Sequence, residues 1–140
     1  MTKLPLAALA LALLAAPAFA AGDAAKGENE FKKCKACHSI VGTDGTAIQK
    51  GGKTGPNLFG VIGRKVASED FAYGESIKAV GETGAVWTEE ELAVYVANPT
   101  EWLKTKLGDA AAKSKMTFKL AKGGEDVAAY LASVAPAAAP

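Results

Sequence analysis

The sequence predicts a single all-α domain of four to five helices joined by long loops. A chain of 140 residues is long enough for one domain with its own core and too short for two. Apolar residues recur at helical spacing near both ends of residues 21–140, and no segment alternates apolar and polar residues as a half-buried strand does. Internal repeats, heptads and glycine-rich phosphate loops are absent from the sequence.

Residues 1–20 have the pattern of a secretory signal peptide. Lys3 provides a positive start, residues 4–16 are largely apolar, and Ala18-Phe19-Ala20 is a small-x-small cleavage site. The alternative is a membrane anchor, but this apolar run is shorter than the ~18 to 20 residues that span a bilayer. We therefore expect export to the periplasm, cleavage after residue 20 or one residue later, and no stable membrane insertion of the mature residues 21–140.

Composition limits the chemistry of the mature chain. After removal of Lys3 it carries 15 basic and 15 acidic residues, so no overall positive charge points to nucleic acid. Its two cysteines and its only histidine all lie within residues 34–38, and Met116 is the only methionine after Met1. No cysteine or histidine remains outside residues 34–38 to build a further metal site or a Cys/His nucleophile. We therefore do not expect an enzyme.

The first helix is expected to begin after Asp23, which is a suitable N-cap residue. Ala24, Gly27, Phe31 and Cys34 then fall on one side of the helix. A glycine inside a helix costs about 1 kcal/mol relative to alanine. Close approach of another helix at Gly27 would explain this residue, and the alternative is that it has no role.

The motif Cys34-Lys35-Ala36-Cys37-His38 indicates covalent attachment of haem. Two thiols three positions apart project from the same side of one helical turn and can both reach the vinyl groups of a porphyrin. The histidine that follows is placed to bind the iron as the proximal ligand. The alternatives are a disulfide, a redox thiol pair or half of a zinc site, but the chain lacks the additional ligands and the βαβ context that the last two require.

Residues 39–69 are rich in glycine and show no sustained periodicity, so we expect a long loop. Within it, Gly55-Pro56 fixes a turn and leaves the Pro56 carbonyl able to accept the Nδ1 proton of His38, which would set the tautomer of the ligand. A simple turn is the alternative. Arg64, the only arginine, could bind a propionate with two hydrogen bonds or could be an ordinary surface residue.

The remainder of the chain predicts four more helices. Thr88 and Glu91 form a capping-box pattern at the start of one helix. Asn98-Pro99 ends that helix and provides the N-cap and first-turn proline of the next. Residues 109–115 are polar and alanine-rich and lead into a loop that carries Met116. These helices are expected at about residues 68–79, 88–98, 99–107 and 125–134.

With these residues in view, the chain resembles the class I c-type cytochromes, closest to the periplasmic cytochrome c2 group. The resemblance covers nearly all of residues 21–140, and the order and spacing of its motifs follow the family. Those motifs are Gly27, Phe31, Cys34-x-x-Cys37-His38, Thr54-Gly55-Pro56-Asn57-Leu58, Gly63-Arg64, Tyr73, Trp87, Tyr95, Asn98-Pro99, Lys115-Met116 and Tyr130.

The resemblance implies a small cytochrome c fold whose helices and long loops surround one covalently attached haem c. It also implies that the Met116 sulfur is the second axial ligand, and composition agrees because Met116 is the one thioether available. Gly27 would contact the terminal helix. The resemblance further implies that a haem propionate lies among Arg64, Tyr73 and Trp87, and that Tyr95 lies near the Met116 sulfur. Relative to the short mitochondrial form, the chain has insertions between Ile40 and Lys53 and between Leu103 and Met116.

An iron bound by both His38 and Met116 has no open position, which favours one-electron transfer over substrate chemistry. We therefore expect a soluble, monomeric periplasmic carrier between a cytochrome bc1 type complex and a photosynthetic reaction centre or terminal oxidase. A ligand-binding or peroxidase-like haem protein with an open sixth position is the alternative, and a thiol-disulfide protein without haem is the third hypothesis.

Lysines near these motifs predict a positive face around the exposed haem edge, where redox partners would dock. The alternative for any one of them is an ordinary solvated side chain. The set comprises Lys32, Lys35, Lys50, Lys53, Lys104, Lys106, Lys113, Lys115, Lys119 and Lys122.

Overall fold

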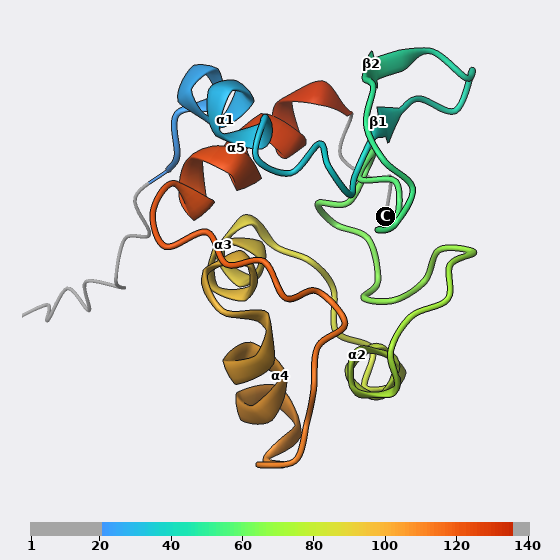
Figure 1. The fold of residues 1–140 in the computed structure, drawn as a ribbon, viewed down its shortest axis with the longest axis vertical. Helices are drawn as coiled ribbons and strands as arrows, with labels where there is room; N and C mark the ends of the chain where they lie inside the picture. Colours follow the sequence, from blue (N-terminus) through green and yellow to red (C-terminus); the bar gives the residue numbers. More distant parts are fainter. Residues whose placement is uncertain (1–20, 136–140) are drawn as a thin grey trace, which may run out of the picture.

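The computed structural model describes residues 21–135. This part of the chain contains five helices and one two-stranded antiparallel hairpin (Figure 1), which confirms the all-α fold class. The predicted signal peptide lies outside the described residues. The elements are α1 (Ala24–Phe31), β1 (Ile40–Val41), β2 (Ala47–Gln49), α2 (Glu75–Glu82), α3 (Glu89–Ala97), α4 (Pro99–Leu107) and α5 (Gly124–Val134).

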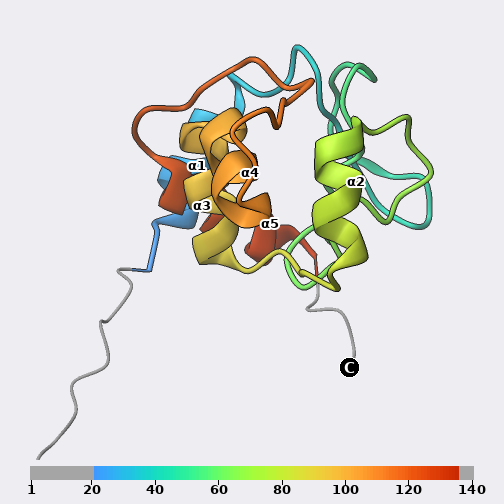
Figure 2. The same cartoon turned by 90° about the horizontal axis from the view of Figure 1, so that it is seen from below.

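The two terminal helices form the centre of the fold. α1 packs against α5, α3 packs against both α5 and α4, and α2 contacts α4. Figure 2 shows α2 standing apart from the group of α1, α3 and α5, with the long loops beside it. Within residues 21–135, no helix has the length and apolar character that crossing a membrane requires.

Gly27 is the point of closest approach between α1 and α5. A Cβ atom built on Gly27 would lie 1.9 Å from the Asp126 carbonyl oxygen and 2.8 Å from the Cβ of Tyr130. Phe31, one turn later, is fully buried and contacts Tyr130 with a ring-centroid distance of 5.8 Å. The predicted helix contact at Gly27 is confirmed, because only a residue without a side chain permits this separation.

Short-range signals set most helix ends. The Asp23 carboxylate accepts hydrogen bonds from the first amides of α1, and the Thr88 hydroxyl accepts one from Glu91 N at 3.1 Å. Asn98 caps α4, Pro99 occupies its first turn, and Gly108 ends it with φ of +61°. These ends were predicted because each depends on residues within one turn of the boundary.

The predicted helix at residues 68–79 is wrong in its first half. α2 begins at Glu75, and residues 68–74 form tight turns instead. Phe71 N donates to Glu69 O and Tyr73 N donates to Phe71 O, both at 2.9 Å, so these amides are engaged in bonds that a helix does not contain. The Phe71 and Tyr73 rings pack edge to face at 5.1 Å, which gives this turn its own apolar contact.

The hairpin of β1 and β2 was not predicted, because the strands have only two and three residues and no alternating pattern. Its support comes from distant side chains. The Asn57 side chain accepts from Val41 N at 3.0 Å and donates to Val41 O at 2.8 Å, and Gln49 Nε2 donates to the Tyr130 hydroxyl at 2.9 Å. The first insertion predicted from the sequence therefore forms a hairpin attached to the Pro56 segment and to α5.

Three aromatic rings and a carboxylate join α3 to α4. Trp87 stacks on Trp102 at 5.0 Å, and Tyr95 contacts both rings at 4.9 and 5.3 Å. Trp102 is 4% exposed, and its indole N–H donates to Glu91 Oε2 at 2.7 Å. Lys106 donates to the other oxygen of the Glu91 carboxylate. Glu91 thus binds the buried tryptophan and a lysine from α4 with its two carboxylate oxygens. The part of the predicted capping box that the structure shows is the bond from Glu91 N to Thr88 Oγ1.

Replacing Glu91 by alanine is expected to destabilise the protein by about 1–3 kcal/mol, because the buried Trp102 N–H loses its acceptor. Burial raises the pKa of the Glu91 carboxyl, but the hydrogen bonds from Lys106 and Trp102 outweigh it, so the pKa lies below its ordinary value of 4.5. Folding therefore favours the charged carboxylate. Its contribution to the free energy of unfolding is complete above pH 4.5 and disappears as the pH falls through the lower pKa of the folded state.

Urea unfolding of the Glu91→Gln variant at several pH values tests this, since glutamine keeps an acceptor oxygen and removes the charge. The stability difference from the unmodified protein should be largest at neutral pH and shrink below pH 4.5. Glu90→Ala, an exposed change in the same turn of α3, is the control and should have little effect. A Glu91→Ala variant as stable as the control would contradict the assigned role.

Candidate functional site

The residues of the Cys34–His38 motif project from one tight turn directly after α1. Cys34 N donates to Phe31 O at 2.8 Å, and the Cys34 carbonyl oxygen accepts from Cys37 N at 3.1 Å and from His38 N at 2.9 Å. Because α1 is fixed against α5, this turn holds two thiols and an imidazole at a defined place on the core. The Cys34 side chain also packs against that core.

Both cysteines are free thiols, with Cys34 half-buried and Cys37 exposed. Burial raises the pKa of the Cys34 thiol to about 11, and the negative charges of Glu30 and Cys37 raise it further, against a smaller effect of Lys33. Reactive redox thiols have a lowered pKa. The environment of Cys34 therefore disfavours the redox thiol pair considered above.

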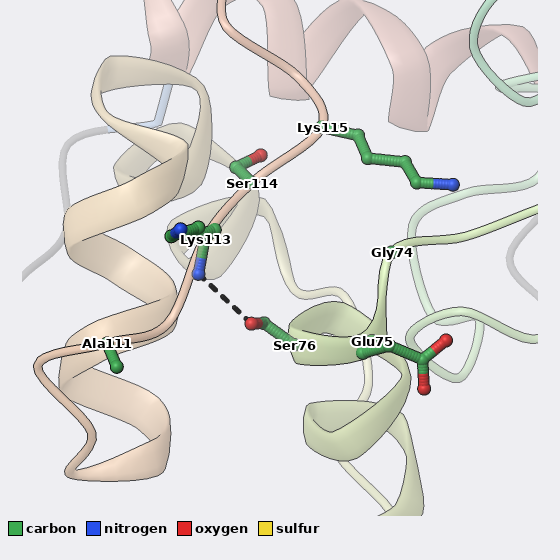
Figure 3. A pocket seen from close by; sticks show the side chains of 7 residues that line it. All are labelled: Gly74, Glu75, Ser76, Ala111, Lys113, Ser114 and Lys115. Atoms are coloured by element: carbon green, nitrogen blue, oxygen red, sulfur yellow. Dashed lines mark hydrogen bonds between the residues drawn. The ribbon is translucent and has the colours of Figure 1, made fainter.

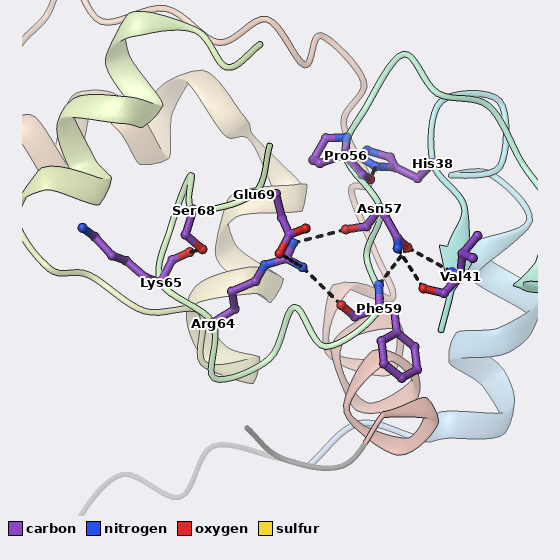
Figure 4. Close-up of polar contacts among 9 residues, drawn as sticks. All are labelled: His38, Val41, Pro56, Asn57, Phe59, Arg64, Lys65, Ser68 and Glu69. Atoms are coloured by element: carbon purple, nitrogen blue, oxygen red, sulfur yellow. Dashed lines mark hydrogen bonds and ion pairs between the residues drawn. The ribbon is translucent and has the colours of Figure 1, made fainter. Parts of the chain in front are cut away.

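The imidazole of His38 is held by the Gly55-Pro56 turn. Its Nδ1 lies 2.8 Å from the Pro56 carbonyl oxygen (Figure 4). A carbonyl can only accept, so Nδ1 carries the proton and Nε2 keeps its lone pair. Burial lowers the pKa of His38 below its ordinary value of 6.5, and the bond to Pro56 opposes this only in part. The ring is therefore neutral at neutral pH and presents Nε2 as a ligand.

Gly55 explains how the turn comes so close to the ring. A Cβ atom on Gly55 would lie 2.3 Å from Cε1 and 2.8 Å from Nε2 of His38. Any side chain here would push the imidazole away from Pro56. The glycine and the proline therefore act together: one allows the approach, and the other supplies the acceptor.

Met116 lies in the loop between α4 and α5, half-buried and packed against the core. The loop is attached to α2 and to the turn that precedes it: Lys113 N donates to Ser76 Oγ of α2, and Lys115 Nζ donates to the Ala72 carbonyl oxygen before α2, both at 3.0 Å. Met116 N itself donates to Ser114 Oγ at 3.1 Å. A cavity of about 300 Å³ lies between α2 and this loop (Figure 3).

Arg64 and Trp87 come together although they are far apart in the sequence. Arg64 and Trp87 are joined through the backbone, since Trp87 N donates to Arg64 O at 2.9 Å. Burial raises the pKa of the Tyr73 hydroxyl, and a backbone hydrogen bond at Glu69 and the positive charge of Arg64 oppose this rise. Burial also raises the pKa of Tyr95, and a side-chain hydrogen bond with Ser114 opposes it, which places Tyr95 near the Met116 loop.

Sequence reasoning missed three supporting side chains: Asn57, Ser76 and Glu69. Asn57 belongs to the Gly-Pro-Asn sequence, and an asparagine after a turn is a usable signal for such bracing. Ser76 and Glu69 act through partners that lie 37 and 5 positions away, and nothing in their local sequence marks them.

Comparisons with known proteins agree with this geometry. The chain is 62% identical over 133 residues to cytochrome c2 of Rhodobacter capsulatus, covering 94% of this chain and 96% of that protein. It is 59% identical to cytochrome c-550 of Paracoccus versutus, covering 94% and 86%. The crystal structure of the Rhodobacter capsulatus protein superposes with a TM-score of 0.80 at 63% identity over 81% of this chain and 98% of that one. No protein-family model matches.

An all-α fold with two thiols three positions apart, able to form thioethers with haem, and an imidazole that presents Nε2 is the arrangement that a c-type cytochrome requires. The chain belongs to the class I c-type cytochromes and within them to the cytochrome c2 group. It is an electron carrier and not an enzyme, and it carries one covalently bound haem c. The residues fit this group, because the thiols are unpaired, the imidazole is neutral and its tautomer is fixed by Pro56.

Proposed function

We propose that this protein carries single electrons through a haem held by Cys34 and Cys37, with His38 and Met116 as the axial ligands of its iron. The observation that carries the proposal is the His38 Nδ1 contact with Pro56, which leaves Nε2 as the only ring nitrogen able to bind a metal. Met116 supports it as the single thioether of the mature chain, on a loop attached to α2. The bound haem supplies one-electron redox chemistry at its iron.

The protein groups contribute orientation and polarity. Pro56 fixes the imidazole and raises its basicity as a donor, while a thioether ligand favours the reduced iron. Arg64, Tyr73 and Trp87 provide polar groups for a propionate, and Tyr95 lies beside the Met116 loop. With both axial positions taken by side chains, no position is left for a substrate.

The test uses the purified holoprotein with carbon monoxide added to the reduced form at neutral pH. We expect little or no rapid binding, because Met116 occupies the sixth position. Rapid, stoichiometric binding would instead support the alternative of a ligand-binding or peroxidase-like protein. Absorption spectra of the oxidised and reduced forms should be those of a c-type haem. Extraction with acid-acetone should leave the haem on the polypeptide, because it is covalently attached.

We further propose that the carrier is a monomer that works in the periplasm after removal of residues 1–20, between a cytochrome bc1 type complex and a photosynthetic reaction centre or terminal oxidase. Partners would dock at the lysine-bearing face around the haem edge. Within the lysine set, Lys104 pairs with Glu101 at 2.9 Å and Lys106 pairs with Glu91, so their charges are partly neutralised. We expect the other members to carry most of the attraction.

Electron transfer to an acidic redox partner is expected to slow as salt rises, because the Debye length shrinks from about 30 Å at 0.01 M to about 8 Å at 0.15 M. Stopped-flow rate constants across this range give the measurement. Lys53→Gln should lower both the rate at low salt and its salt dependence. Lys26→Gln, an exposed lysine of α1 outside the set, is the control and should leave both unchanged. A rate constant that does not fall as salt rises would contradict the proposal that charge guides docking.

A further inference from the structure

The only arginine of the chain has a carboxylate partner that sequence reasoning did not find. Arg64 Nη1 lies 3.1 Å from Glu69 Oε1, and the arginine side chain is 15% exposed while that of Glu69 is 42% exposed. The same guanidinium donates from Nη1 to Phe59 O at 3.1 Å and from Nη2 to Asn57 O at 3.2 Å (Figure 4). Three contacts therefore fix its position.

These contacts leave part of the guanidinium available. Arginine has five N–H donors in a planar fork, and those at Nε and the second one at Nη2 are not used by Phe59, Asn57 or Glu69. Donors of this kind bind a carboxylate well. The guanidinium is thus held from one side by a protein carboxylate and two carbonyls, with donors left for a second anion.

Glu69 also lies next to the other groups of this region. Glu69 and Arg64 both affect the pKa of the Tyr73 hydroxyl, and Trp87 is joined to Arg64 through the backbone. The negative charge of the Glu69 carboxylate partly cancels the positive charge of the Arg64 guanidinium. Oxidised iron carries one more positive charge than reduced iron, so a nearby carboxylate favours the oxidised form and a nearby guanidinium favours the reduced form.

We propose that Glu69 is a positioning residue that restrains the Arg64 guanidinium, offsets its charge and thereby lowers the reduction potential of the protein. This inference rests on the proposed function, in which Arg64 faces a haem propionate. It adds that a carboxylate on the turn of residues 68–74 determines how much positive charge the Arg64 guanidinium presents to the propionate. Removing that carboxylate takes away the compensating negative charge and one of the three contacts that restrain the guanidinium.

The test is the reduction potential of the Glu69→Gln holoprotein, measured by spectroscopic redox titration at pH 7 and low salt. We expect the reduction equilibrium to shift about three- to tenfold toward the reduced form, where tenfold corresponds to about 59 mV for one electron. Glu69→Asp should restore most of the original value. Glu101→Gln, which breaks the comparable pair with Lys104 at 2.9 Å, is the matched control for net charge. A Glu69→Gln shift no larger than the control overturns the proposal.

A second background separates positioning from a simple charge effect. In Arg64→Gln protein, the Glu69→Gln shift should be much smaller, because there is no guanidinium to release. An equal shift in both backgrounds would show that Glu69 acts only as a distant charge. If Arg64→Gln does not yield holoprotein, Arg64→Lys serves, since it keeps the charge and loses the fork.

The same variants distinguish the two levels of inference. If Arg64→Gln alone leaves the potential unchanged, Arg64 does not face the propionate, and the proposed placement fails together with the role of Glu69. If the arginine variant lowers the potential and Glu69→Gln does not change it, only the role of Glu69 fails.

Discussion

Replacing Gly27 by valine is expected to destabilise the protein by more than about 3 kcal/mol, a large part of the 5–15 kcal/mol that holds a typical domain folded. The new Cβ would lie 1.9 Å from the Asp126 carbonyl oxygen, which is backbone of α5 and cannot turn aside. α1 and α5 would have to separate, and the fully buried Phe31 would lose its contact with Tyr130.

Urea unfolding of the holoprotein, followed by far-UV circular dichroism, gives the measurement. Ala25→Val is the matched control, since it adds the same β-branched side chain to an exposed position of α1 and should cost about 1 kcal/mol or less. A Gly27→Val protein as stable as this control would show that the two helices can tolerate a wider separation.

Replacing Met116 by alanine is expected to have the largest effect on redox behaviour. The mature chain has no other thioether, so the sixth position would be left to water or to a weaker donor. The weak long-wavelength band of the oxidised protein should disappear, carbon monoxide should bind the reduced form rapidly, and the reduction equilibrium should shift by more than tenfold toward the oxidised form.

Thr117→Ala is the control for this change, because it alters the exposed neighbour of Met116 and leaves the sulfur in place. Spectra of the oxidised variants and reduced-state binding of carbon monoxide are the two readouts. A Met116→Ala protein with an unchanged ligand field would exclude Met116 as the ligand.

The parts of the fold that follow from local sequence could be predicted. Asn98, Pro99 and Gly108 specify the bounds of α4 within one turn of each end, and the Gly27 contact follows from the cost of glycine in a helix. The Cys34–His38 motif could be located for the same reason, since its spacing within a single turn predicts haem attachment.

The rest depends on contacts between distant segments. The turns at residues 68–74 look helical by periodicity, yet their amides bond carbonyls two residues back and the Phe71 and Tyr73 rings pack on each other. The hairpin strands are too short to produce a pattern, and their partners Asn57 and Tyr130 come from elsewhere. The pairing of Arg64 with Glu69 likewise exists only once residues 68–74 have folded back.

Asn57 joins two features that are otherwise separate. Its side chain bonds the backbone of β1, and it directly follows Pro56, whose carbonyl oxygen lies 2.8 Å from Nδ1 of His38. One amide side chain therefore links the surface hairpin to the turn whose carbonyl oxygen holds the imidazole. With His38 as the proposed ligand, changes in this hairpin would give evolution a way to adjust the affinity of the iron for an electron without altering the ligand residues themselves.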